Sequence, residues 1–173
     1  MLAAAGADGW AVCPILRPSA AVWLQDRISA LGDLAGEPVR TQFWLPSGRS
    51  LPPADAVLVA PATANTVNKC AAGISDSLAL GMLNDAIGRG LPVVLVVAAG
   101  ADRAHPAFRR SVTLLRAAGV RLLVDAGSGG GSRTGDAGAG LRWRKGLAQL
   151  RSRTSLGTPE RNDLAASNTH RGP

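Results

Sequence analysis

Three hydrogen-bonding side chains, those of Thr63, Asn65 and Thr66, come directly after the apolar segment 55–61. The apolar segment is predicted to be a buried strand, and the residues after it a helix. Hydroxyl and amide groups donate and accept hydrogen bonds, and the first N–H groups of a helix are free to bind an anion. The small side chain of Ala64 would let a flat ligand approach the backbone. The pattern predicts a small-molecule site, and the alternative is that Thr63 or Asn65 only caps the helix.

Apolar segments alternate with segments of helical periodicity along most of the chain. The predicted strands are 10–16, 39–45, 55–61, 91–99 and 120–125, and the predicted helices are 1–7, 18–35, 62–88 and 105–119. Gly36 and Gly73 are expected to end helices, and Asp76 to cap one. Apolar residues at helical spacing predict the inward face of helix 18–35: Val22, Ile28, Leu31 and Leu34. Apolar strands between helices indicate a parallel sheet covered on both faces, and such sheets bind ligands at the C-terminal ends of their strands.

The composition fits one globular domain followed by a basic tail. The chain has 173 residues, 46% of them hydrophobic, and a net charge of +7. Most of the excess positive charge lies after Gly127, and the part before it has no basic stripe interleaved with aromatic residues. Nucleic-acid-binding domains carry such a stripe, so no nucleic-acid partner is expected. A separate hypothesis is that the basic tail binds an anionic surface, with an affinity that falls as salt rises.

Cysteine and histidine are too few and too widely spaced to predict a metal site. Cys13 and Cys70 are expected to be reduced core residues, His105 to start a helix, and His170 to lie in the tail. No apolar run is long enough to span a membrane, and the N-terminus lacks the pattern of a signal peptide. We therefore expect a cytoplasmic protein.

A change of composition near Asp125 predicts the domain organisation. Residues 1–126 are predicted to form an α/β domain, and the Gly/Ser-rich residues 127–140 a flexible linker. Residues 141–151 are predicted to form a C-terminal helix, and residues 152–173 a disordered tail.

The segment APATANTVNKCAAGISDSLA, residues 60–79, closely resembles the signature of the homo-oligomeric flavin-containing cysteine decarboxylases. That family includes phosphopantothenoylcysteine decarboxylase and the decarboxylases of lanthipeptide maturation. The resemblance continues in PSAAVWL (18–24), HPAFRRSVTLLRAAGVRLL (105–123) and LRWRKGLAQL (141–150), and it covers roughly residues 1–150. It implies a Rossmann-like (flavodoxin-like) three-layer fold with a parallel sheet. It also implies FMN bound near a subunit interface, in trimers or multiples of trimers.

The resemblance also implies roles for individual residues. Ser19 should lie near the phosphate of FMN. Thr63, Ala64, Asn65 and Thr66 should line the flavin and the substrate, with Asn65 as the partner of a substrate carboxylate. The decarboxylases of the family oxidise a cysteine moiety through the flavin and then lose carbon dioxide, which is redox and lyase chemistry on a small molecule or peptide.

Two catalytic positions depart from the family pattern. Ser47 stands at the position where the family has its catalytic His, and no His occurs from Met1 to Ala104. The family members that act on the pantetheine precursor have a Pro-Ala-Met-Asn motif, and Ala99 stands where its Asn would be. His105 matches a His-Pro pair of the family and does not replace the missing His. The catalytic residues are therefore unknown, and decarboxylase activity is doubtful.

The resemblance further implies a first strand and a Gly/Ser phosphate loop ahead of the helix with which this chain begins. In the family that strand lies in the middle of the sheet, and its neighbours pair with it. Unsatisfied buried backbone groups cost about 1–3 kcal/mol each. We therefore expect that the natural chain starts further upstream, that the gene has decayed, or that another chain fills the gap.

Two readings of function follow. The first is an FMN-binding flavoprotein that, as a redox enzyme, acts on a cysteine-derived or other thiol or carboxylate compound or peptide. The alternative is a non-catalytic family member that serves as a binding or regulatory subunit, and the missing catalytic residues favour it.

Overall fold

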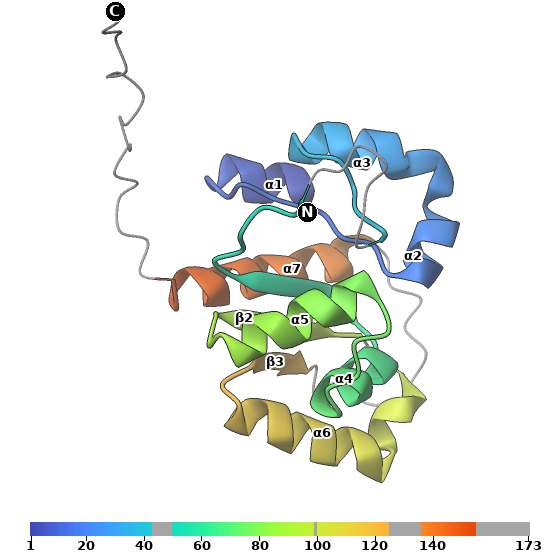
Figure 1. Cartoon of the computed structure of the whole chain (residues 1–173), viewed down its shortest axis with the longest axis vertical. Helices are drawn as coiled ribbons and strands as arrows, with labels where there is room; N and C mark the ends of the chain where they lie inside the picture. The colour runs from blue at the N-terminus through green and yellow to red at the C-terminus, as the bar shows by residue number, and fades with distance from the viewer. Residues whose placement is uncertain (43–49, 99, 125–135, 155–173) are drawn as a thin grey trace, which may run out of the picture.

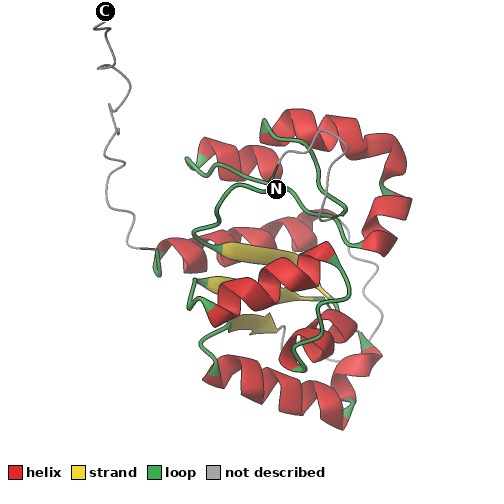
Figure 2. Cartoon of the chain, viewed as in Figure 1, coloured by secondary structure: helices red, strands yellow, loops and turns green. Residues whose placement is uncertain are grey.

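The computed structural model describes residues 1–42, 50–98, 100–124 and 136–154. Figure 1 shows a sheet with helices on both of its faces, and Figure 2 shows the same layers by type of secondary structure. The helix α7 (Asp136–Arg151) lies on one face, and α4 (Ala64–Ala71), α5 (Leu78–Gly88) and α6 (Pro106–Ala117) lie on the other. This is the predicted three-layer α/β fold with a parallel sheet, which is confirmed.

The sheet described here has three parallel strands in the order β1 (Val57–Ala62), β2 (Val93–Val97) and β3 (Arg121–Val124). Every residue of the central strand β2 is buried. The predicted strands 55–61, 91–99 and 120–125 are thereby confirmed as elements, with β1 beginning at Val57; Ala99 and Asp125 lie outside the described residues. Helices α4 and α5 after β1, and α6 after β2, return the chain so that the next strand runs parallel, and the three C-terminal ends therefore lie at the same edge.

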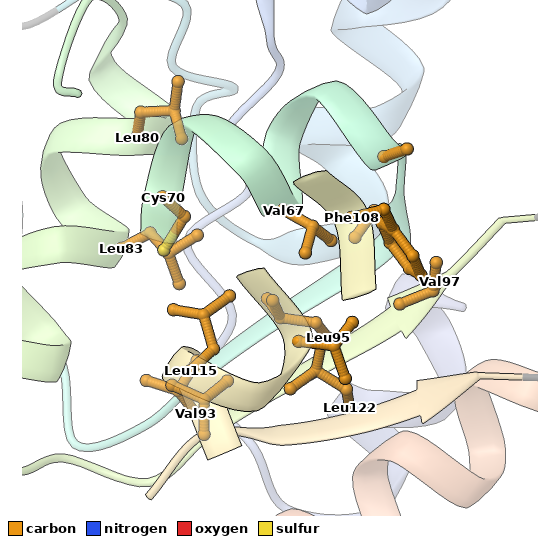
Figure 3. Packing of buried hydrophobic residues seen from close by; sticks show 14 of the residues in the cluster. Val67, Cys70, Leu80, Leu83, Val93, Leu95, Val97, Phe108, Leu115 and Leu122 are labelled. Carbon is orange, nitrogen blue, oxygen red and sulfur yellow. The ribbon is translucent and has the colours of Figure 1, made fainter. Parts of the chain in front are cut away.

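Alternate residues of the strands face the two helical layers. Val93, Leu95 and Val97 belong to a core cluster with residues of α4, α5 and α6 (Figure 3). On the opposite face, Leu58 and Val96 contact α7 at Gly146. Side chains of a strand alternate between its faces, so a fully apolar strand such as β2 fits a sheet buried on both sides.

The two helices between β1 and β2 begin with side-chain caps. Thr63 caps α4 and Ser77 caps α5. The predicted cap Asp76 is wrong, because its carboxylate pairs with Lys69 at 2.5 Å instead. Gly73, at φ +70°, separates the two helices as predicted. The short helix η2 (Ala101–Ala104) precedes α6.

The N-terminal region is more irregular than the sequence predicts. It contains α1 (Leu2–Ala7), α2 (Pro18–Trp23), the short helix η1 (Gln25–Arg27) and α3 (Ile28–Ala35). α3 ends at Gly36, as predicted, with φ +70°. The single predicted helix 18–35 is therefore broken, and its predicted inward face is wrong in part. Val22 is 66% exposed and Leu34 57% exposed, whereas Ile28 and Leu31 are half-buried.

The predicted strands 10–16 and 39–45 are wrong within the described residues, where they form only one parallel bridge, Ile15 to Arg40. The N–H of Arg40 donates to Pro14 O at 2.8 Å, and the N–H of Leu16 donates to Arg40 O at 2.8 Å. Pro14 has no N–H to offer to a further neighbour, and an isolated two-segment pair is only marginally stable. The bridge therefore stays short; residues 43–45 lie outside the described part of the chain.

The C-terminal helix α7 begins at Asp136 rather than at the predicted Leu141, so it extends into the predicted linker. Leu147 and Leu150 are buried on it. Most of the predicted tail lies outside the described residues. Within the described part of the chain, no helix is long and apolar enough to cross a membrane.

Candidate functional site

The C-terminal end of β1 leads directly into α4, as the sequence predicts. The register with β2 shifts between Val59 and Ala62, at Pro61, which cannot donate to the ladder. Thr63 then adopts an extended conformation, and its Oγ1 accepts a hydrogen bond from the N–H of Thr66 at 3.3 Å. The capping role of Thr63 is confirmed, and the turn fixes the first N–H groups of α4 at the edge where the strands end.

A guanidinium group from far along the chain meets this turn. Arg17 Nη1 donates to Thr66 Oγ1 at 2.8 Å and to Thr63 Oγ1 at 3.2 Å. The two hydroxyl oxygens are 3.0 Å apart. Thr66 is 4% exposed, and Arg17 is partly buried. These three side chains, here called the Arg17 corner, form a small cluster of hydrogen-bond donors with a net positive charge.

The local sequence explains the position of Arg17. It is the N-cap residue of α2, in extended conformation, and Pro18 occupies the first position of the helix. Proline favours that position because its fixed φ suits a helix start. Ser19 follows in the first turn, with its side chain exposed. The starts of α2 and α4 are thus brought together, and neither first turn contains an acidic residue.

The other residues predicted for the site lie on the same first turn of α4. Asn65 is exposed, whereas Ala64 is 3% exposed and belongs to the core cluster. Ala64 can therefore offer a ligand its backbone and not its side chain. Of the predicted set, the structure brings Thr63 and Thr66 into direct contact, and it places Asn65 beside them on the surface.

Ser47 and Ala99, the two positions expected to bear on catalysis, are outside the described residues. His105 starts α6, where its Nδ1 accepts from the N–H of Ala107 at 3.1 Å, as predicted. Among the described residues, no group of three or more His, Cys, Asp or Glu side chains could hold a metal ion.

The two cysteines are free thiols in different surroundings. Cys70, on α4, is 4% exposed, and burial raises its pKa to about 11. Cys13 is only half-buried; burial raises its pKa, and the nearby Arg40 charge offsets part of that effect. A raised pKa leaves little thiolate at neutral pH, so neither thiol is prepared to act as a nucleophile.

Sequence reasoning missed two residues near the turn. Arg17 carried no local signal, because its partners are distant in sequence. Asn68, on α4, has a buried Oδ1 that makes no hydrogen bond to any described residue. Its place inside the motif was visible, but nothing in the spacing showed that its carbonyl oxygen would be enclosed.

A family model described as Flavoprotein matches residues 38–137 of the chain. The chain belongs to the flavoprotein family. The match includes β1, the Thr63 turn, α4 and the rest of the sheet. The polar turn at the strand end therefore lies inside the part of the chain that the flavoprotein model matches.

Known proteins resemble the chain in sequence and in fold. A cysteine/cysteine sulfinic acid decarboxylase from an unknown prokaryotic organism is 40% identical over 76 residues, which are 43% of this chain and 20% of the relative's length. The crystal structure of the FMN-dependent cysteine decarboxylase TvaF from thioviridamide biosynthesis has a TM-score of 0.59 at 26% identity, covering 85% of this chain and 86% of TvaF.

Two further structures agree on the fold. The cypemycin decarboxylase CypD has a TM-score of 0.54 at 25% identity and covers 79% of this chain and 78% of CypD. AnUbiX, in complex with FMN and dimethylallyl pyrophosphate, has a TM-score of 0.66 at 15% identity, covering 86% of this chain and 81% of AnUbiX. The resemblance of the sequence to the flavin-containing cysteine decarboxylases is thus confirmed by TvaF and the cysteine/cysteine sulfinic acid decarboxylase, and AnUbiX shows the fold alone.

Proposed function

We propose that this flavoprotein binds FMN with its phosphate end at the starts of α2 and α4. The observation that carries the proposal is the donor set of the Arg17 corner, which joins two hydroxyls and a guanidinium at a helix start without an acidic residue. These donors can bind an anion, and no carboxylate in the first turns of the two helices would repel it. Membership in the flavoprotein family and the FMN dependence of TvaF support FMN as the molecule whose phosphate group is this anion.

The residues of the first turns have separate parts in this proposal. The exposed hydroxyl of Ser19 donates to the phosphate, and the first N–H groups of α4 face the same ligand. Asn65, exposed on that turn, binds a carboxylate of the substrate through its amide N–H group. FMN, when bound, supplies a two-electron acceptor for a substrate.

The substrate proposed is a cysteine-derived or other thiol or carboxylate compound, free or at the end of a peptide. Decarboxylation is not part of the reaction that we propose for this chain. It needs a titratable group within hydrogen-bond reach of the reacting atoms, and no His occurs from Met1 to Ala104. Asp55, a carboxylate near β1, is exposed ahead of the strand, at the end opposite the Thr63 turn.

The same missing His favours a second candidate, a flavoprotein subunit that binds and does not catalyse. It predicts no turnover of any thiol substrate, together with association with an intact relative of the family. A pull-down that returns only this chain, combined with measurable substrate oxidation, would exclude that candidate.

Equilibrium dialysis against FMN tests the proposed function. We expect saturable binding of FMN to the folded chain. Thr66→Val should weaken it about tenfold or more, because the variant removes a buried hydroxyl while keeping the side-chain shape. The matched control is Thr113→Val on α6, where the exposed hydroxyl donates to Arg109 O, and it should bind like wild type. Absence of FMN binding by the folded wild-type chain would refute the proposal.

A further inference from the structure

The outer surface of α6 and the start of β3 carry positive charge without negative charge. Residues 103–124 contain no Asp or Glu. Four arginines of this segment are exposed: Arg109, Arg110, Arg116 and Arg121. Figure 1 shows α6 and β3 at the end of the molecule opposite the helices α1, α2 and α3. These four arginines, together with Leu114 between them in sequence, are here called the α6 surface.

The guanidinium groups of the α6 surface have no partner within the described chain. None of the four forms an ion pair with a described residue or donates a hydrogen bond to one. Other exposed cations do have carboxylate partners: Arg89 lies 3.3 Å from Asp85, and Arg151 lies 3.7 Å from Asp8. Uncompensated charges of one sign attract a ligand of the opposite sign. The α6 surface therefore has its full charge available to a partner.

The spacing along α6 places these groups on its solvent side. Arg109 and Arg116 are two helical turns apart, so they share one side of the helix at a separation of about 10 Å. Arg110 and Leu114 are one turn apart and are neighbours on the adjoining side. Leu114 is 55% exposed. The surface thus combines separated positive charges with an exposed apolar side chain.

A further guanidinium group is held beside the α6 surface by the fold. Arg153, which follows α7, donates from Nη1 to Gly119 O at 2.7 Å, in the turn between α6 and β3. A carbonyl oxygen carries no net charge, so this contact fixes the guanidinium without neutralising it. Positive groups from α6, from β3 and from the segment after α7 therefore meet at this turn.

We propose that the α6 surface is a docking site for an acidic segment of a partner protein. Carboxylates pair with arginine through charge-assisted, often bidentate hydrogen bonds, and Leu114 offers a contact to an apolar side chain of such a segment. A nucleic acid is the other common polyanion, and single strands are bound by stacking their bases on aromatic side chains. The only Phe, Trp or Tyr in residues 103–124 is Phe108, which is 4% exposed. The observations therefore favour a peptide, and they do not depend on the proposed flavin site.

Fluorescence anisotropy of a labelled peptide, titrated with the full chain, tests this inference. The probe is a peptide of about ten residues with Glu at most positions and one central Leu. Its control carries Gln in place of every Glu. We expect the Glu peptide to bind, with an affinity that falls at least about threefold when salt rises from about 0.05 M to about 0.2 M. The Gln peptide should show no measurable binding.

Variants of the chain locate the bound peptide. Arg109→Gln combined with Arg110→Gln should weaken binding about tenfold, because each exposed charge lost removes a factor of about two to five. Leu114→Ser should weaken it about threefold through lost apolar contact and leave the salt dependence unchanged. The matched control is Arg27→Gln, an exposed arginine on η1, which should bind like wild type. Circular dichroism establishes that each variant is folded.

Three results would overturn the inference. The first is that the folded wild-type chain does not bind the Glu peptide. The second is equal binding by wild type and the double arginine variant, which would place the peptide elsewhere on the chain. The third comes from a labelled thymidine oligonucleotide of similar length: tighter binding than the peptide, weakened by the same double variant, would assign the surface to nucleic acid. FMN binding should be the same in wild type and the double variant, so the proposed function and this inference can fail separately.

Discussion

Thr63 has two roles at once, since its single hydroxyl oxygen caps α4 and also accepts from Arg17. A local sequence pattern predicts the first role: a small polar residue between an apolar strand and a helix. The second role could not be predicted, because Arg17 lies 46 residues away in sequence and only the fold brings it there. The sequence thus located the turn and its hydroxyls, but not the charge that accompanies them.

Thr63→Ala should lower the free energy of unfolding by about 1 kcal/mol, the usual value of a helix cap. Thr63→Ser, which keeps the hydroxyl, should restore most of it. Urea unfolding followed by circular dichroism measures both. Equal stability of the Ala variant and wild type would mean that the cap contributes nothing.

The buried Cys70 predicts a loss of stability in alkaline solution. Its pKa in the folded chain is about 11, above its ordinary value of 9.0. Between these values the unfolded chain loses the thiol proton while the folded chain keeps it, so the free energy of unfolding falls as pH rises. Below about pH 9 both states hold the proton, and the effect vanishes.

Urea unfolding of wild type and Cys70→Ala at about pH 8 and about pH 10 isolates this effect. Wild type should lose more stability between the two conditions than the variant does. The same loss in both proteins would assign the alkaline sensitivity to other groups.

At the scale of elements, the sequence predicts correctly those segments that have neighbours on their faces and edges. β2 is apolar throughout and is covered on both faces and both edges, so its composition matches its burial. Segment 10–16 is also largely apolar, but within the described residues it shares only the Ile15–Arg40 bridge with segment 39–45. Strand formation depends on neighbours as much as on composition, and the identity of neighbours is not visible in a local pattern.

The packing of α7 on the sheet depends on Gly146. A Cβ at this position would lie 2.8 Å from Leu58 Cδ1 and 3.0 Å from Val96 Cγ2. Gly146→Val should therefore lower the free energy of unfolding by about 2 kcal/mol, as overpacking in a core does. Thermal or urea unfolding measures the change.

The matched control is Gly88→Val at the end of α5, where no atom lies within 4 Å of the added Cβ. It should change stability by less than about 0.5 kcal/mol. If both variants lose the same stability, the cost comes from valine in a helix and not from the contact with the sheet.

At the scale of the whole molecule, α2 carries exposed apolar side chains next to the Arg17 corner. Trp23 is 86% exposed and Val22 66% exposed. Adjacent exposed apolar residues of this size are typical of association surfaces. We propose that copies of the chain associate through this face of α2, which agrees with the homo-oligomers that the family resemblance implies.

Sedimentation velocity should then show an assembly for wild type and a shift toward the single chain for Trp23→Ser. Leu114→Ser is the control, because Leu114 is 55% exposed on α6 and away from α2. Sedimentation of wild type as a single chain at all concentrations would contradict the proposed association.

The central claim is that a flavin nucleotide binds where α2 and α4 begin. Hydrogen–deuterium exchange of the wild-type chain, with and without saturating FMN, tests it most directly, since it reports where the ligand acts as well as whether it binds. We predict that FMN slows exchange at least about tenfold in the peptides that cover residues 17–19 and 63–66. Exchange that is unchanged in both peptides, or slowed only in other parts of the chain, would contradict the account.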